Sequence, residues 1–234
     1  MANLLHVTFT GIDDNTDASW LLGIRTQYPK VEFGMLMAVE PVKRSGRFPD
    51  PEGPAARGFY EAARRGLGLS AHLCGSLAKE AAKGEWGAVM EHCPEFSAFS
   101  RCQLNIAHVK DVPAAVVTGM PGTLREVIVQ QKGAGSCEAF LQIPRKDGYS
   151  VLLDASGGHG VYAEPVVLEG PYKVGYAGGL NPDNVRGFLE SLLADVRVGD
   201  FWIDMESGVR TGDDLFSPGK VEAVIRNIED LLLC

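Results

Sequence analysis

The sequence predicts a single barrel of eight parallel strands, each followed by a helix. Eight short, mostly apolar runs begin roughly 23 to 37 residues apart along the 234 residues, which leaves room for a strand, a helix and two loops each time. The 28 glycines and 13 prolines are scattered, as many strand-to-loop junctions require. An open doubly wound sheet would show the same alternation, but eight units in one chain of this length favour closure. We therefore expect one barrel domain over residues 1–234.

Each predicted element follows from local pattern. The strands are expected at 4–9, 32–38, 69–73, 102–107, 126–130, 150–153, 173–177 and 201–205. Helical spacing of apolar residues predicts helices at 18–26, 57–65, 76–83, 185–194 and 219–233. Ser217 and Pro218 supply a good start for the last helix. A long loop over 40–54, rich in proline and glycine, follows the second strand, and loops of this length are usually functional or mobile.

Charge and cysteine content narrow the choice of partners. A net charge of −8 and a pI near 5.2 argue against binding to nucleic acid or to a membrane surface. The amino-terminal residues do not resemble a signal peptide, and five irregularly spaced cysteines without a C-x-x-C pair fit reduced thiols. We therefore expect a cytoplasmic protein that binds neither nucleic acid nor a membrane, and its oligomeric state, monomer or homodimer, is left open. No recognised ligand spacing points to a metal or cofactor.

The segment 173–185, KVGYAGGLNPDNV, predicts an anion site. A strand runs into Gly178 and Gly179 and then into a helix start, so that backbone N–H groups can approach a ligand closely. A similar turn with Ser207 and Gly208 follows the last strand. Successive strand ends of this kind commonly hold one phosphate in a barrel. Alternatively, the glycines serve the turns alone, and Arg210 either assists or is a solvated charge.

Polar residues at the other strand ends are candidates for chemistry. Residues two apart share a face, so we expect seven side chains at the barrel mouth, namely His72, Cys74, Gln103, Asn105, Asp154, Asp204 and Glu206. Asp154 ends an apolar strand and precedes a glycine-rich loop with His159. Burial raises the pKa of such a carboxyl, which suits a general acid. The alternative is that Asp154 only caps its loop, that Cys74 is a buried apolar residue, and that His159 is solvent-exposed.

Four motifs resemble the phosphoribosylanthranilate isomerase family. YAGGLNPDNV is similar to the family's AGGL-x-P-[ED]-NV, IDMESGVRT to its DVSSGVE, LLDASGGHG to its LLD with a glycine-rich loop, and VTFTGI to its KICGI. The resemblance implies a (β/α)8 barrel that binds an N-phosphoribosyl arylamine. It also implies a cofactor-free Amadori rearrangement and phosphate binding by Gly178, Gly179, Ser207 and Gly208.

The resemblance also assigns catalytic roles. It makes Asp154 the acid that protonates the ring oxygen, and it places a catalytic cysteine, the base that removes the C2 proton, where this chain has Thr10. A hydroxyl of very high pKa cannot replace a thiolate, so Cys74, His72 and Asp204 become the candidate bases. An arginine that binds the substrate carboxylate corresponds to Arg47 or Arg44.

The sequence thus favours an isomerase of a phosphoribosyl amine or related sugar phosphate. Two alternatives stay open. One is a lyase, aldolase-like or hydrolytic enzyme on a phosphosugar, for which Lys132 is the modest candidate to form a Schiff base. The other is a non-catalytic protein that binds a phosphorylated ligand.

Overall fold

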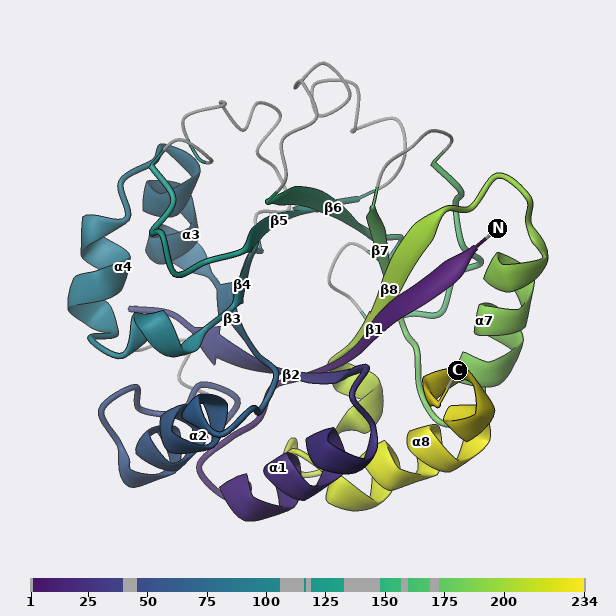
Figure 1. Ribbon diagram of the computed structural model, residues 1–234, viewed down its shortest axis with the longest axis horizontal. Coiled ribbons are helices and arrows are strands. Elements are labelled where there is room, and N and C mark those ends of the chain that lie inside the picture. The colour runs from purple at the N-terminus through teal and green to yellow at the C-terminus, as the bar shows by residue number, and fades with distance from the viewer. Residues whose placement is uncertain are drawn as a thin grey trace.

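The strands of the computed structural model close into one parallel barrel, as predicted (Figure 1). The model describes residues 2–39, 46–105, 116, 119–132, 148–156, 160–168 and 173–233. The strands are β1 (Asn3–Thr10), β2 (Val31–Met37), β3 (Leu69–Leu73), β4 (Arg101–Leu104), β5 (Glu126–Gln131), β6 (Tyr149–Asp154), β7 (Val174–Ala177) and β8 (Asp200–Met205). Each pairs with its sequence neighbour, and β1 pairs with β8, which closes the barrel. All eight predicted strands are confirmed. Their ends differ from the prediction by at most one residue, except that β4 ends at Leu104 whereas the predicted strand 102–107 continues into residues that the model does not describe.

The described helices lie outside the barrel of strands (Figure 1). They are α1 (Ala18–Gln27), α2 (Pro54–Arg64), α3 (Gly75–Ala82), α4 (Gly87–His92), α7 (Val185–Ala194) and α8 (Pro218–Leu232). The side chain of Asp17 caps α1, and the side chain of Ser217 caps α8, as its sequence suggests. None of the described helices is long and apolar enough to cross a membrane.

The helix α4 was not predicted. It has only six residues, and the side chain of Trp86, its N-cap residue, makes no hydrogen bond to its first turn. Apolar periodicity needs a window of about 11 residues to indicate a helix, so a helix of this length is stabilised by packing rather than by its own sequence. Val89 supplies that packing, since it is fully buried.

The barrel interior is unusually polar for this architecture, in which branched apolar residues normally dominate. At the amino-terminal ends of the strands, Arg101 bonds to both Glu32 and Glu126, and Lys173 also bonds to Glu126. Above this layer Gly175 leaves room for the ring of Trp202, because a Cβ at Gly175 would lie 2.3 Å from that ring. The polar residues at the carboxyl ends therefore lie above a layer of buried ion pairs.

Candidate active site

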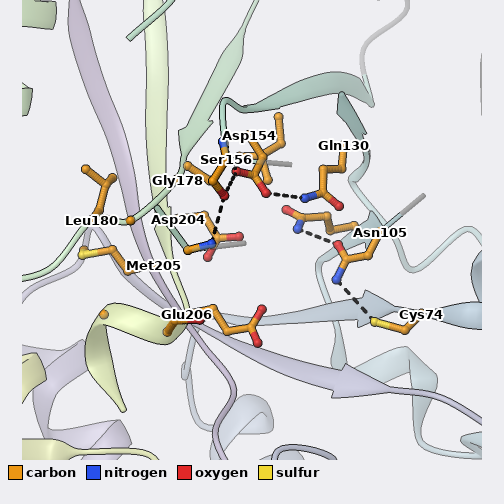
Figure 2. A pocket seen from close by; sticks show the side chains of 17 residues that line it. Cys74, Asn105, Gln130, Asp154, Ser156, Gly178, Leu180, Asp204, Met205 and Glu206 are labelled. Carbon is orange, nitrogen blue, oxygen red and sulfur yellow. Dashed lines mark hydrogen bonds between the residues drawn. The ribbon is translucent and has the colours of Figure 1, made fainter. Parts of the chain in front are cut away.

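A cavity of about 340 Å³ opens at the carboxyl ends of the strands (Figure 2). Its size is suited to a small ligand. It is lined by Cys74, Gln103, Asn105, Gln130, Leu152, Asp154, Ser156, Gly160, Ala177, Gly178, Gly179, Leu180, Asp204, Met205, Glu206, Ser207 and Gly208. The structure thus brings together residues from β3 through β8 that lie up to 134 positions apart, between Cys74 and Gly208.

Asp204, near the end of β8, is the most perturbed carboxyl that lines the cavity. Burial raises its pKa to about 7, and the neighbouring carboxylates of Glu32 and Asp154 act in the same direction. Hydrogen bonds from Thr10 and Gln103 oppose the rise but do not cancel it. The group can therefore exchange a proton near neutral pH, as a general acid or base must.

Thr10 lies at the end of β1 and is 1% exposed. Its hydroxyl donates to Asp204 Oδ1 at 2.7 Å, and its Oγ1 is 3.5 Å from His72 Nε2. Thr10 is not among the residues that line the cavity. At the position where the sequence resemblance places a catalytic cysteine, this chain instead has a hydroxyl that donates to Asp204.

Asp154, the last residue of β6, accepts hydrogen bonds from Gln130 and Ser156. Gln130 Nε2 donates to its Oδ2 at 2.8 Å, while the backbone N–H and the hydroxyl of Ser156 donate to its Oδ1 at 3.0 and 2.7 Å. Figure 2 shows Gln130 and Ser156 beside Asp154, with their hydrogen bonds as dashed lines. The sequence suggested that Asp154 caps its loop through backbone N–H groups, and the N–H of Ser156 makes such a contact. Asp154 also lines the cavity, so this contact does not exclude a role toward a ligand.

Neutral polar side chains from β3, β4 and β5 form another wall of the cavity. Gln103 Nε2 donates to Asn105 Oδ1 at 2.8 Å, and Asn105 Nδ2 donates to Cys74 Sγ at 3.5 Å. Cys74 is partly exposed at the start of α3, so it is not the fully buried apolar residue that was the alternative. This wall can exchange hydrogen bonds with a ligand through groups that carry no charge.

The glycine turns after β7 and β8 meet at the opposite wall. Gly179 has φ +63°, a conformation that favours glycine, and a Cβ there would lie 2.1 Å from Tyr162 N. A Cβ at Gly208 would lie 1.8 Å from Leu180 O, so the two turns are in close contact. All four predicted phosphate-binding residues line the cavity. The helix α7 begins only at Val185, so the backbone nearest the cavity belongs to the glycine turn rather than to the helix.

The arginines near the mouth are engaged in ion pairs. Arg47 donates to Glu206 Oε1 at 2.6 Å and to both carboxylate oxygens of Asp214 at 2.8 and 2.9 Å. Arg210 is 2% exposed and bonds to Asp13 and to the backbone of Gly11. Neither guanidinium lines the cavity. Arg210 is therefore not a solvated surface charge, and Arg47 is placed to hold Glu206.

His72 was expected at the barrel mouth, but in the structure it does not line the cavity. Its ring lies inside the barrel, 1% exposed, with Nε2 3.1 Å from Ser70 Oγ and Nδ1 3.9 Å from Asp204 Oδ2. Burial lowers its pKa to about 4, so the imidazole is neutral at pH 7. A Cβ at Gly34 would lie 2.8 Å from Nε2, so the ring of His72 occupies the space that the missing side chain of Gly34 leaves. His159 and Arg44 lie outside the described residues.

Sequence reasoning found Glu206 at the end of the last strand, but it missed two polar residues that line the cavity, namely Gln130 and Ser156. Gln130 could have been found from the alternation along its strand, since it lies two residues from an inward position. Ser156 gave no such signal, because its place depends on how the loop after β6 turns back. Lys132, the candidate Schiff-base lysine, is exposed and does not line the cavity.

Comparison with known proteins agrees with this geometry. Residues 119–227 match the family model described as N-(5'phosphoribosyl)anthranilate (PRA) isomerase. The comparison with curated proteins gives no match. Among solved structures, phosphoribosyl anthranilate isomerase from Thermus thermophilus is 22% identical, with 97% of this chain and 99% of that chain covered and a TM-score of 0.62. TrpF from Jonesia denitrificans is 17% identical, with 97% and 98% covered and a TM-score of 0.62.

A third structure carries a ligand. It is a phosphoribosyl anthranilate isomerase in complex with reduced 1-(o-carboxyphenylamino)-1-deoxyribulose 5-phosphate, 16% identical, with 97% of this chain and all of that chain covered and a TM-score of 0.60. At these identities the likeness establishes the barrel fold, while residues 119–227 carry the similarity in sequence.

Proposed function

We propose, from the premise that the chain belongs to the phosphoribosylanthranilate isomerase superfamily as a diverged member, that it is an isomerase of a phosphoribosyl amine or related sugar phosphate. The observation that carries the proposal is the pairing of two carboxyl groups, Asp154 and Asp204, in one cavity with two glycine turns. The turns would hold the phosphate through backbone N–H groups. The carboxyls would move the protons.

The reaction that this arrangement supports is an aldose–ketose rearrangement. Asp154 protonates the ring oxygen, so that the sugar opens to an imine without forming a free alkoxide. A base then removes the proton from C2 of the protonated imine to give an enaminol, and protonation at C1 with loss of the C2 hydroxyl proton gives the aminoketose. The reaction needs a second group that exchanges a proton near neutral pH, and the pKa of Asp204 near 7 suits that role.

Asp204 is the best supported of the three candidate bases. His72 is shielded from the cavity by its position inside the barrel, with its pKa lowered to about 4 by burial. Cys74 lies at the edge of the carboxamide wall, where its Sγ accepts a bond from Asn105. Asp204 lines the cavity beside Asp154 and is oriented by Thr10. The family's thiolate would thus be replaced by a carboxylate from another strand.

Turnover of freshly generated N-(5'-phosphoribosyl)anthranilate, followed by loss of its fluorescence, gives the first test. Asp154→Asn and Asp204→Asn should each lower kcat by about 10²- to 10⁴-fold, because each removes one proton transfer. Asp200→Asn is the matched control, since Asp200 is an exposed carboxyl at the other end of β8. Affinity for a non-reacting phosphate-bearing product analogue should survive in all three variants.

Two results would contradict the proposal. Full activity in Asp154→Asn would remove the acid from the mechanism. Turnover of neither phosphoribosyl anthranilate nor any other phosphoribosyl amine, together with an analogue that binds and is recovered unchanged, would favour the non-catalytic alternative.

A further inference from the structure

We propose that Ser156 is a positioning residue that couples the phosphate end of the cavity to the acid Asp154, so that a bound phosphate group holds this carboxyl in place for proton transfer. The inference rests on the proposed function for the identity of the acid and of the phosphate-binding turns. It goes further in assigning a role to the loop that joins them. Figure 2 shows Asp154, Ser156 and Gly178 next to one another at one side of the cavity.

The hydroxyl of Ser156 makes hydrogen bonds in two directions. It donates to Asp154 Oδ1 at 2.7 Å, and its oxygen accepts from the backbone N–H of Gly160 at 3.1 Å. The backbone N–H of Ser156 donates to the same carboxylate oxygen at 3.0 Å. A hydroxyl can donate and accept at the same time, so one side chain joins the acid to a later part of its own loop.

That later part, the segment 160–162, packs against both glycine turns. Gly160 has φ +65°, and a Cβ there would lie 3.2 Å from both the Cβ and the Oγ of Ser207. On the other turn, a Cβ at Gly179 would lie 2.1 Å from Tyr162 N. Because close-packed groups of this kind transmit displacements to one another, a ligand that fixes the two turns also fixes the segment.

Two further contacts complete the path from the turns to the acid. The ring of Tyr162 packs edge-on against Phe188 of α7, with ring centroids 6.4 Å apart. A Cβ at Gly178 would lie 3.2 Å from Ser156 N and 3.4 Å from Asp154 Oδ1. The phosphate turn after β7 is therefore in contact with both ends of the hydrogen bond between Ser156 and Asp154.

This path allows the phosphate to contribute to the chemical step. Contacts with a remote, non-reacting part of a substrate raise kcat only when they help to position the groups that react. Misplacement of such a group by about 1 Å can lower a rate by about 10²-fold. Because the Ser156 hydroxyl bonds both to the acid and to the segment packed on the turns, its loss should separate phosphate binding from catalysis.

Dividing the substrate into two pieces tests the coupling. The pieces are N-ribosylanthranilate, which lacks the phosphate, and inorganic phosphite, a dianion that can occupy a phosphate site. In the wild type, phosphite should raise kcat/KM for N-ribosylanthranilate at least about tenfold. In Ser156→Ala the activation should fall below about twofold, whereas a hydroxyl that only stabilised the loop would lower the rates with and without phosphite by the same factor. Ser191→Ala, which removes an exposed hydroxyl on α7, is the matched control and should leave the activation unchanged.

Amide exchange measured by NMR gives a readout that needs no turnover. In the wild type, saturating inorganic phosphate should shift the N–H signals of Gly178 and Gly179 and slow exchange of the Gly160 N–H at least about tenfold. In Ser156→Ala the two shifts should remain, while the Gly160 N–H should exchange rapidly with and without phosphate, because its acceptor is gone.

The outcomes separate this inference from the proposed function. Phosphite activation that is absent from the wild type or unchanged in Ser156→Ala would overturn the inference and leave the isomerase intact, as would a Gly160 N–H that bound phosphate does not slow. Slowing at Gly160 without turnover of any phosphoribosyl amine would support the inference and overturn the isomerase. Unshifted signals at Gly178 and Gly179 would remove the phosphate site on which both rest. The measurements on the wild type stand even where Ser156→Ala prevents folding.

Discussion

The Asp204 carboxyl has a pKa that couples folding to pH. Burial raises this pKa from 3.8 to about 7, so the folded state holds the proton more tightly than the unfolded state does. The favourable contribution is complete below about 3.8 and is lost as the pH rises through 7. At about 1.4 kcal/mol for each pH unit, the loss amounts to roughly 4 kcal/mol. Such a cost at neutral pH is typical of groups retained for chemistry.

We therefore expect Asp204→Asn to gain stability relative to the wild type as the pH rises. Between pH 5 and pH 8 the difference in free energy of unfolding should move by roughly 3 kcal/mol in favour of the variant, because only the wild type must ionise the buried group. Urea unfolding at the two pH values measures it. Asp200→Asn should show little change, and a constant difference for Asp204→Asn would mean that this carboxyl titrates normally.

The same pKa predicts the shape of the activity profile. A base must be ionised to accept a proton, so kcat/KM should rise about tenfold per pH unit below 7 and level off above it. Rates between pH 5.5 and 8.5 with the first substrate found to turn over would show this. A profile that is flat across the range would remove Asp204 from the role of base.

Single residues show where prediction from sequence reached its limit. Asp154 and Asp204 could be selected because each ends a strand, and strand ends of a barrel converge. The hydrogen bond between Thr10 and Asp204 could not, since it joins residues 194 positions apart through the pairing of β1 with β8. The position of His72 inside the barrel depends on the empty space at Gly34, which no local pattern reveals.

At the scale of elements, the turns after β7 and β8 behave as one unit. Gly208→Ala should separate them, because its Cβ would lie 1.8 Å from Leu180 O. We expect affinity for a phosphate-bearing ligand to fall at least tenfold, together with a destabilisation of about 1–3 kcal/mol from overpacking. Calorimetry with the reduced product analogue and thermal unfolding measure the two effects.

Gly187→Ala is the control for this substitution. Gly187 lies in α7, and nothing would lie within 4 Å of an added Cβ. Alanine should stabilise that helix by about 0.5–1 kcal/mol without changing ligand affinity. Equal affinities in the two variants would show that contact between the turns is not needed to hold the ligand.

The strands, which recur at regular spacing along the chain, were predicted well, whereas the short helix α4 was not predicted. The strands follow from buried runs such as β2, every residue of which is buried. The short helix α4 and the ion pairs of Arg47 depend on tertiary packing, the latter on residues 159 and 167 positions away. Composition and spacing report burial and period, and they carry no information on which distant charges will meet.

At the scale of the whole molecule, the barrel has two polar layers. Asp204, Gln103 and Thr10 belong to the upper layer, and the buried pair of Glu32 and Arg101 to the lower one. Although burial opposes ionisation, the charges of Arg101 and Lys173 lower the pKa of Glu126 to about 2, and Arg101 likewise lowers that of Glu32. The ring of Trp202 lies 4.7 Å from the Arg101 guanidinium. Arg101 is thus the centre of charge balance below the cavity.

Arg101→Met should therefore destabilise the barrel far more than a surface substitution. It leaves Glu32 buried without its cation, while Lys173 still faces Glu126, and breaking such a pair on one side costs about 3–5 kcal/mol. Adding Glu32→Gln removes the orphaned charge, so Glu32→Gln/Arg101→Met should recover most of the loss. Urea unfolding at pH 7.5 compares the two variants with the wild type. A single variant within 1 kcal/mol of the wild type, or a double variant no better than the single one, would show that the barrel is not stabilised through the charge of Arg101.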